Sequence, residues 1–380
     1  MEDMKTALLF LAFAFGGAYA TSFEEHLLAT DLKGGYQVVA ADLNHDGHVD
    51  LIALASGLPD LLWFENPGPK GGDWKRHVIV SNHKHMINCS AWDYDGDGIP
   101  EIVLATEFAN EAKNSAGVVS VLHHEGDPSQ PWSIKEIDRL TTSHRLRWAD
   151  IDGSGKKVLV NAPLTGAKAE APEYRDNAPL VYYRPGEWKR EMIGEANHGV
   201  QHGIYINDWD GDRRDEILTA SFSGIGIYKL LKSGTWQYRL LTAGDPTAWP
   251  KSGSSDIAVG KAGETRYVAA IEPWHGNQVV AYGPNWDRKV IDDSLVDGHT
   301  IATADFDGDG TDEIVAGFRG AGRSVFIYRR DESGWKKSVL DQGGMAAAAC
   351  AIADFNEDGR PDVACIGSAT ANLKWYENKK

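Results

Sequence analysis

A short acidic segment that recurs along the chain constrains its fold more than any other feature. The fullest copy, residues 305–313, reads Asp-Phe-Asp-Gly-Asp-Gly-Thr-Asp-Glu, with oxygen-bearing side chains at positions 1, 3, 5 and 9 and glycine at position 6. Four further copies begin at Asp42, Asp93, Asp208 and Asp354. Because repetition at long intervals is typical of arrays of equivalent units, the chain is predicted to be built from one repeated element.

The chemistry of the segment indicates a calcium site. Alternating carboxylates around a tight glycine turn can surround one hard cation, and Ca²⁺ prefers such oxygen ligands. An EF-hand is excluded, because the last carboxylate falls at position 9 instead of 12 and strand-like residues follow it. Asp/Asn/Gly turns without an ion are the alternative, and five copies favour calcium. The predicted calcium ligands are Asp42, Asn44, Asp46, Asp50, Asp93, Asp95, Asp97, Glu101, Asp208, Asp210, Asp212, Glu216, Asp305, Asp307, Asp309, Glu313, Asp354, Asn356, Asp358 and Asp362.

Apolar runs around each acidic segment identify the repeated element. One run precedes the segment and one follows it, then comes an aromatic run and a fourth run that opens with an aromatic residue. Such runs of four to eight residues between Gly/Asp turns are typical of strands. Seven four-stranded units at spacings of 45 to 58 residues predict an all-β, seven-bladed β-propeller. The units are anchored at Asp42, Asp93, Asp150, Asp208, about Gly260, Asp305 and Asp354.

The ends of the chain predict how the ring closes. Residues 23–29 read as an outer strand, whereas the chain ends on a third strand at residues 373–378. The N-terminal strand should therefore complete the last blade and leave only short, protected sheet edges. The third and fifth units depart from the acidic rule: Ser154 and Val158 stand where ligands belong, and residues 260–264 provide none. These two blades are predicted to bind no ion.

Residues 1–20 are predicted to be an export signal. Residues 7–15 are apolar, a glycine pair interrupts them, and Ala18-Tyr19-Ala20 fits a small-x-small cleavage site. The run is too short for a bilayer, which needs about 20 apolar residues, and a buried strand is the alternative. Residues 21–380 should then form the propeller, secreted or periplasmic, monomeric and without a membrane span.

Cysteine content and charge add two expectations. Three cysteines leave at least one thiol unpaired. Cys350 and Cys365 flank the Asp354 segment symmetrically, so a disulfide could join them, although two small buried side chains are the expected outcome. The net charge of −17 argues against nucleic acid as a partner, and bound calcium would cancel much of it.

A second register appears when the units are aligned on the first loop aspartate. The position six residues earlier starts the innermost strand, at the channel mouth opposite the calcium loops. Histidine occupies this position in three of the units. Three imidazoles that converge at the channel mouth can bind Zn²⁺ or another transition metal and leave a position for water or substrate. The alternative is that these histidines are separate polar residues that line a wet channel. His85 and His198 could join the histidine group. The seven residues are Tyr36, Ile87, His144, His202, Ser254, His299 and Ala348.

Loops between the second and third strands should rise on the same face and add polar groups. An aromatic platform with amides and charged groups is suited to a sugar, and arginine can hold a carboxylate or phosphate with two hydrogen bonds. Ordinary loop polarity is the alternative. The predicted substrate-binding residues are Tyr36, Glu107, Arg145, Trp274 and Arg323, and the predicted catalytic residues are Glu272, His275 and Arg319.

The acidic segment followed by a hydrophobic strand resembles FG-GAP/VCBS-type repeats, over roughly residues 30–378. The resemblance implies structural calcium loops between the first and second strands of each blade. It does not select a function, because such propellers serve as integrin heads, lectins, lyases and scaffolds. Residues 198–215, 253–277 and 297–328 further resemble the propeller portion of the aldos-2-ulose dehydratase/isomerase family. That resemblance implies a secreted enzyme that abstracts a proton next to a ketone with the help of a metal and then eliminates water.

The resulting hypothesis is a dehydratase, isomerase or lyase that acts on an oxidised sugar. A metal at His144, His202 and His299 would polarise the substrate carbonyl or carboxylate. Glu272 or His275 would remove the neighbouring proton, and Arg319 would steady the enolate. A non-catalytic carbohydrate-binding or adhesion propeller is the alternative.

Overall fold

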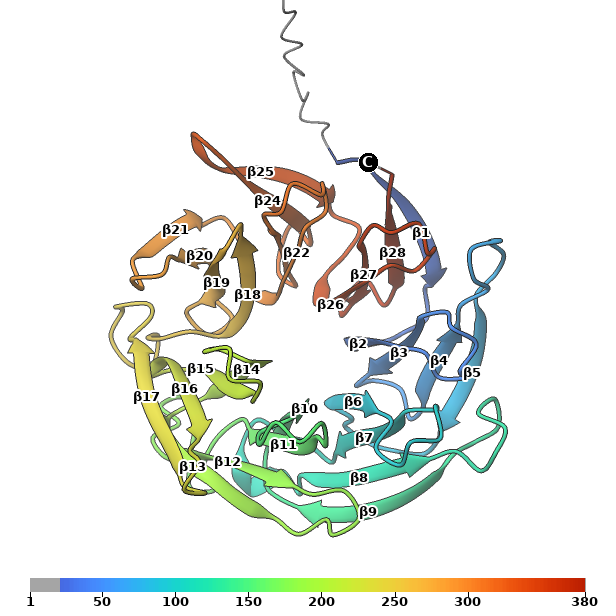
Figure 1. Cartoon of the computed structure of the whole chain (residues 1–380), viewed down its shortest axis with the longest axis horizontal. Coiled ribbons are helices and arrows are strands. Elements are labelled where there is room, and N and C mark those ends of the chain that lie inside the picture. The colour runs from blue at the N-terminus through green and yellow to red at the C-terminus, as the bar shows by residue number, and fades with distance from the viewer. Residues whose placement is uncertain (1–20, 380) are drawn as a thin grey trace, which may run out of the picture.

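The computed structural model describes residues 21–379, which form a closed ring of four-stranded antiparallel sheets around a central channel (Figure 1). In six of the sheets the strands run outward from the channel in chain order, and in the seventh the first strand of the chain is added at the outer edge. The first strand of every repeated unit is therefore innermost. The predicted seven-bladed β-propeller is thereby confirmed. The predicted signal, residues 1–20, lies outside the described residues.

The blades match the units that the repeat predicts. Blades one to three contain β2 (Gly35–Ala41), β3 (Asp50–Ala55), β4 (Leu61–Glu65) and β5 (Lys75–Val80); β6 (Asn88–Trp92), β7 (Glu101–Thr106), β8 (Val118–His123) and β9 (Ser133–Arg139); and β10 (Ser143–Ala149), β11 (Val158–Pro163), β12 (Asn177–Tyr183) and β13 (Glu191–His198). Blades four to six contain β14 (Gln201–Asn207), β15 (Glu216–Ser221), β16 (Gly224–Leu230) and β17 (Trp236–Thr242); β18 (Asp256–Ala262), β19 (Thr265–Glu272), β20 (Gln278–Tyr282) and β21 (Arg288–Asp292); and β22 (Gly298–Ala304), β23 (Glu313–Phe318), β24 (Val325–Asp331) and β25 (Gly334–Asp341). Blade seven combines β26 (Ala347–Ala353), β27 (Asp362–Gly367) and β28 (Leu373–Asn378) with β1 (Phe23–Ala29). A short 3₁₀ turn, η1 (Ala112–Asn114), follows β7.

The ring closes through the N-terminal strand, as predicted. Strand β1 pairs antiparallel with β28, from Phe23 opposite Asn378 to Ala29 opposite Leu373. The two strands lie side by side at the outer edge of blade seven (Figure 1). Pairing of the first and last strands ties the two ends of the described chain into one sheet.

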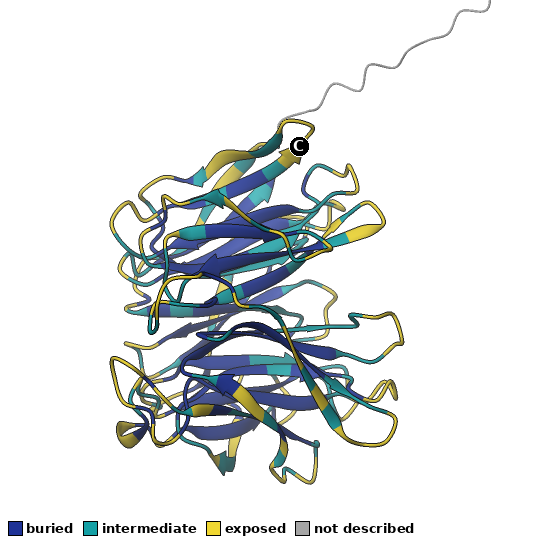
Figure 2. Ribbon diagram, turned by 90° about the vertical axis from the view of Figure 1, so that its left-hand side faces the viewer, coloured by how far each residue is buried: buried dark blue, intermediate teal, exposed yellow. Residues whose placement is uncertain are grey.

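The hydrophobic core lies between neighbouring blades rather than inside a single sheet. Seven apolar clusters each draw buried side chains from two adjacent blades, so the ring is held by seven similar interfaces within the described residues. Figure 2 shows the strands buried through their middle and the loops exposed on both faces. Each fully buried large apolar side chain contributes about 1.5–3 kcal/mol, which makes these interfaces the main source of stability.

Third-strand tyrosines add polar ties between blades. The hydroxyls of Tyr183 and Tyr376 donate to Asp138 and Asp341 at 2.6 and 2.8 Å. In both cases the carboxylate lies on the outer strand of the preceding blade. A buried hydroxyl needs such a partner, so the aromatic position of the repeat supplies packing and an interblade hydrogen bond together.

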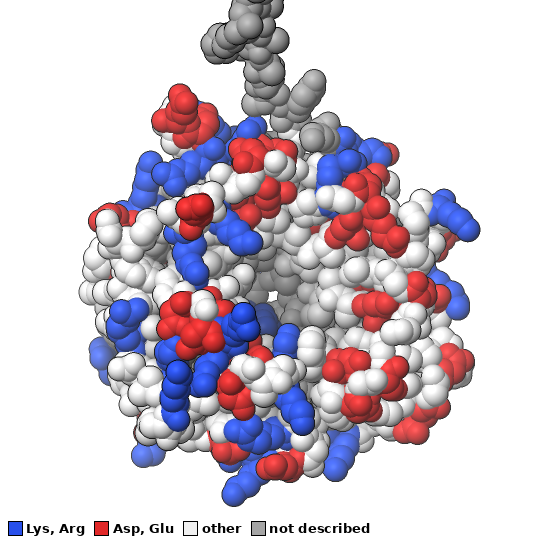
Figure 3. Space-filling model, viewed as in Figure 1, with Lys and Arg blue, Asp and Glu red and all other residues white. Residues whose placement is uncertain are grey.

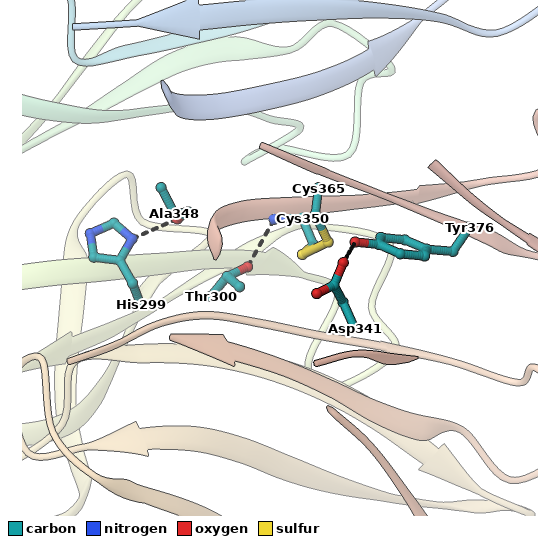
Figure 4. Close-up of a disulfide and its surroundings, with 7 residues drawn as sticks. All are labelled: His299, Thr300, Asp341, Ala348, Cys350, Cys365 and Tyr376. Carbon is teal, nitrogen blue, oxygen red and sulfur yellow. Dashed lines mark hydrogen bonds between the residues drawn. A yellow bond between two sulfur atoms is a disulfide. The ribbon is translucent and has the colours of Figure 1, made fainter. Parts of the chain in front are cut away.

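Cys350 and Cys365 form a disulfide, with their α-carbons 4.1 Å apart (Figure 4). The expectation of two separate buried thiols is therefore wrong. The register of β26 and β27 places the two cysteines directly opposite each other, which brings the sulfurs within bonding range. Cys89 is the free, buried thiol of the described chain. No helix in the described part of the chain is long and apolar enough to cross a membrane.

Candidate functional site

A β-bulge lies at the register position that carries the histidines. Where the first and second strands of a blade pair, the register shifts by one residue, and the residue at the shift has no partner. A bulged residue bends its strand and re-aims its side chain, here toward the channel. The bulged residues are Tyr36, His144, His202, His299 and Ala348, in blades one, three, four, six and seven.

Imidazoles from four consecutive blades meet in the channel. The ring centroids of His144 and His202 are 5.0 Å apart, and those of His202 and His299 are 5.1 Å apart. His275, in the loop after β19, lies 5.0 Å from His202 and 5.1 Å from His299. We refer to these four residues as the histidine layer. The three strand histidines are each only 2% exposed and are nearly closed to solvent, whereas His275 is half-buried.

Hydrogen bonds at Nδ1 fix the orientation of two of these imidazoles. His299 Nδ1 donates to the carbonyl oxygen of Ala348 at 2.6 Å (Figure 4), and its Nε2 is buried without a hydrogen-bond partner. His202 Nδ1 lies 3.2 Å from the carbonyl oxygen of Ser255, and its Nε2 is 3.4 Å from Nε2 of His275. Donation through Nδ1 leaves the lone pair on Nε2, as in metal-binding histidines held by outer partners.

Burial keeps the layer uncharged. Desolvation, followed by the charge of Arg145 or Arg319, lowers the pKa of each of the three strand histidines well below its usual value. Burial and the Arg319 guanidinium lower the pKa of His275 to about 4, against an opposing contribution from Asp297. Neutral imidazoles at pH 7 can ligate a metal or accept a proton.

The candidate metal ligands differ from the predicted set by one residue. Nε2 of His144 already faces the Tyr36 hydroxyl at 2.9 Å and the Arg145 guanidinium at 3.1 Å. A cation there would compete with Arg145, so His144 fits a metal less well than His202, whose Nε2 lies farther from the same guanidinium, at 3.4 Å. The ring nitrogens that all lie within 4.8 Å of one another belong to His202, His275 and His299. The unpartnered Nε2 of His299 is the observation that fits this trio to a metal.

A cavity of about 320 Å³ opens over the layer and receives two predicted substrate-binding residues, Tyr36 and Trp274, and two predicted catalytic residues, His275 and Arg319. Trp274 packs with its ring centroid 4.7 Å from that of His275. Arg319 lies 3.2 Å from His275 Nδ1 and is held by both oxygens of Asp297. The ring is open near its centre in the surface view (Figure 3). The cavity is lined by Tyr36, Ser56, His85, Met86, Ile87, Phe108, Asn110, His144, Leu164, His202, Trp274, His275 and Arg319.

Glu272 does not reach the layer, contrary to its predicted role as a base. Its carboxylate accepts from the Tyr282 hydroxyl at 2.7 Å and from Arg288 Nε at 2.8 Å, and the side chain is fully buried in blade five. The tyrosine belongs to the third-strand position that binds a carboxylate in other blades. Glu272 therefore serves the packing of the blade.

Three other predicted residues lie away from the cavity. Glu107 is exposed beside Arg139, with 3.7 Å between their charged groups, and lines a separate surface groove. Arg323 is exposed on the loop before β24. His198 ends the outer strand of blade three, where it forms a hydrogen bond with Asn177 and packs against Trp249. It therefore does not join the layer. Linear spacing identifies the loop on which a residue lies, but not the direction of its side chain.

The acidic loops form compact turns with a buried final carboxylate. In all five, the position-9 carboxylate accepts from the backbone N–H at position 2. Glu101 Oε1 is buried without a hydrogen-bond partner, and the carboxylates of Asp93, Asp95 and Asp97 converge. This arrangement fits a calcium ion in blade two.

Blades four and six carry a basic side chain against their acidic loops. Lys229, on β16, contacts Asp210 and lies 2.8 Å from Asp212 and 2.9 Å from Glu216. Arg329, on β24, lies 2.6 Å from Asp307. The chain thus provides its own cation beside the carboxylates of these two predicted calcium sites, whereas the corresponding third-strand residues of blades one and seven are Glu65 and Glu377.

Comparison with known proteins places this geometry in a class. The model of the FG-GAP-like repeat matches residues 42–104 and 305–365. The model of the aldos-2-ulose dehydratase β-propeller domain matches residues 116–285, the part that contributes three imidazoles of the histidine layer. Both resemblances predicted from the sequence are confirmed: the chain is a β-propeller with segments similar to FG-GAP-like repeats and to the aldos-2-ulose dehydratase β-propeller domain.

Individual relatives agree with this class. Aldos-2-ulose dehydratase of Phanerodontia chrysosporium is 24% identical over 317 residues, or 72% of this chain, and the chain spans about a third (35%) of that protein's length. Among solved structures, BBS1N in complex with ARL6DN has a TM-score of 0.59 at 12% identity, covering 95% of this chain and 97% of its own. The Dos1 propeller has a TM-score of 0.54 at 8% identity, covering 90% and 78%. The two structural matches show the fold alone.

Proposed function

We propose that the protein is a sugar-directed enzyme that dehydrates, isomerises or cleaves an oxidised sugar by removing a proton next to a carbonyl group. The single observation that carries this proposal is the convergence of four neutral imidazoles, from blades three to six, beneath a cavity lined by Trp274 and Arg319. The relation to a protein named aldos-2-ulose dehydratase supports the substrate class.

The residues divide into two groups in this proposal. His202, His275 and His299 would hold a transition metal, which when bound polarises a carbonyl oxygen as a Lewis acid. On the other side, the Tyr36 hydroxyl donates to His144 at 2.9 Å. This pair can relay a proton from the substrate carbon through the Tyr36 oxygen to the buried imidazole, which its lowered pKa keeps neutral at pH 7. Arg319, anchored by Asp297, faces the cavity with a positive charge suited to a developing enolate.

We further propose export and calcium binding. The Cys350–Cys365 disulfide supports a non-reducing compartment, where such bonds persist. The convergent carboxylates of blade two support an ion there.

Solvent exchange tests the catalytic proposal. Removal of a carbon-bound proton in D₂O should introduce deuterium next to the carbonyl of an aldos-2-ulose, or eliminate water, and proton NMR follows both. We expect the wild type to do so and His144→Ala to lose roughly 10²–10⁴-fold, the usual contribution of general base catalysis. The matched control is His198→Ala, whose imidazole lies outside the layer.

A carbohydrate-binding propeller would give a different result. In that case aldos-2-uloses and uronic polysaccharides would bind without exchange or product, and the His144 variant would change affinity alone. No exchange and no product with any member of such a panel would refute the enzymatic proposal.

A further inference from the structure

A second cavity, of about 470 Å³, lies in the channel on the side of the acidic loops. Its lining includes Trp92, Tyr205, Thr303 and Ile352, which lie toward the loop ends of the innermost strands β6, β14, β22 and β26. Tyr36 and His299 line this cavity, and Tyr36 also lines the cavity on the opposite face. The histidine layer therefore separates two chambers. The proposed reaction takes place in the opposite one, although Tyr36 and His299, which that reaction uses, also line the loop-side chamber.

The charge of this loop-side chamber is opposite to that of the protein. Three basic residues line it, namely Arg145, Arg147 and Lys157, against the single carboxylate of Asp256. The whole chain carries a net charge of −17. An excess of positive charge inside the channel of an acidic protein is suited to an anionic ligand.

Both guanidinium groups lack a carboxylate partner. Arg145 is 6% exposed and contacts the Tyr36 hydroxyl and two imidazoles, all of them uncharged. Arg147 donates to the Asn88 amide oxygen at 3.2 Å and to the Leu146 carbonyl at 2.8 Å. Among the described residues, neither arginine forms an ion pair within 4 Å. Beyond ion-pair distance, Asp256 interacts with both guanidinium groups, so a single carboxylate faces two arginines in this chamber. Uncompensated positive charge inside a protein is costly to folding, so the excess indicates a site that an anion completes.

The spacing of Arg145 and Arg147 suits a small anionic group between the two guanidinium groups. Arg145 and Arg147 are two residues apart on β10, and side chains at that spacing point to the same side of a strand, about 6.5–7 Å apart. Burial, followed by the charge of Arg145, lowers the pKa of Arg147 to about 10, which leaves Arg147 charged at neutral pH. Lys157 stands at the loop end of the chamber, with its ammonium 3.7 Å from the centre of the Trp92 ring. That indole offers a flat apolar face beside the cationic groups.

We propose that the loop-side chamber binds a small hydroxylated anion, with its carboxylate or phosphate held by Arg145 and Arg147 and its body beside Trp92. Guanidinium groups bind both kinds of anion with paired hydrogen bonds. Asp256 supplies an acceptor for ligand hydroxyls. The inference concerns a different chamber from the proposed reaction, and it stands whether or not the protein is catalytic.

Calorimetric titration of the full mature protein tests this site. The probes are D-glucuronate for a carboxylate, D-glucose 6-phosphate for a phosphate, inorganic phosphate for a bare anion, and D-glucose as the neutral control. We expect one of the two sugar anions to bind, D-glucose not to bind, and affinity to fall as salt is raised. Arg147→Gln should weaken binding roughly ten- to a hundredfold, as expected for the loss of a charged hydrogen-bond donor.

Two further variants separate binding from folding. Arg147→Lys keeps the charge without the paired donors and should retain part of the affinity. Arg239→Gln, on the exposed outer strand β17, removes a surface arginine as the matched control and should bind as the wild type does. Tight binding of inorganic phosphate alone would assign an ion site in place of a sugar-anion site and overturn the proposal. Equal binding of D-glucose, unchanged affinity in folded Arg147→Gln, or no binding of either sugar anion would also overturn it.

Discussion

Individual residues show where the sequence is informative and where it stops. His144, His202 and His299 share one sequence position, and a β-bulge turns that position toward the channel in each blade. The repeat alone was therefore sufficient to predict that they meet. Glu272 lies beside the same loop as His275, yet its carboxylate points into blade five. Nothing in linear spacing distinguishes these two directions, because they depend on which neighbour offers a hydrogen-bond partner.

A substitution at Glu272 tests its reassigned role. Glu272→Ala leaves the Tyr282 hydroxyl and the Arg288 guanidinium without their acceptor, which should lower the free energy of unfolding by about 2–4 kcal/mol. Chemical denaturation measures this change. Activity per folded molecule should stay at the wild-type level. A variant of unchanged stability that has lost activity would restore the catalytic role.

At the scale of the elements, the loop and the third strand of a blade act together. The sequence predicts each acidic loop correctly as a turn between two strands, but in blades four and six the cation beside the loop comes from a strand 17 or 22 residues later. The residue after the third-strand aromatic is Lys229 in blade four and Arg329 in blade six. An alignment of the units shows that this position is basic in blades four and six and glutamate in blades one and seven. The difference becomes interpretable only when the structure shows that the third strand contacts the acidic loop.

Calcium stoichiometry tests this pairing. If the ammonium of Lys229 neutralises the blade-four loop, Lys229→Met should free the carboxylates of Asp210, Asp212 and Glu216 and add one bound calcium per chain. The measurement is elemental mass spectrometry after equilibration with calcium and desalting. Lys232→Met, an exposed lysine in the following turn, is the control. Equal calcium content in wild type and Lys229→Met would show that the lysine does not substitute for the ion.

At the scale of the whole molecule, the period of the repeat accounts for the ring, its seven interblade cores and its closure by β1. A closed ring brings residues from different blades to one axis, so a histidine at one repeat position becomes part of a cluster. The chambers above and below that cluster were harder to predict. Arg147 and Lys157 have no basic counterpart at the same position of the other units, so the repeat gives no sign that both line the channel.

The most direct test of the central claim, that imidazoles from separate blades serve one bound species, is the transition-metal content of the purified protein. Elemental mass spectrometry should find about one such ion per chain in the wild type and in His198→Ala. The ion should be lost in His202→Ala and His299→Ala, which remove two of the three candidate ligands while the calcium loops on the other face stay intact. Calcium alone in the wild type, or equal transition-metal content in all four proteins, would contradict the account.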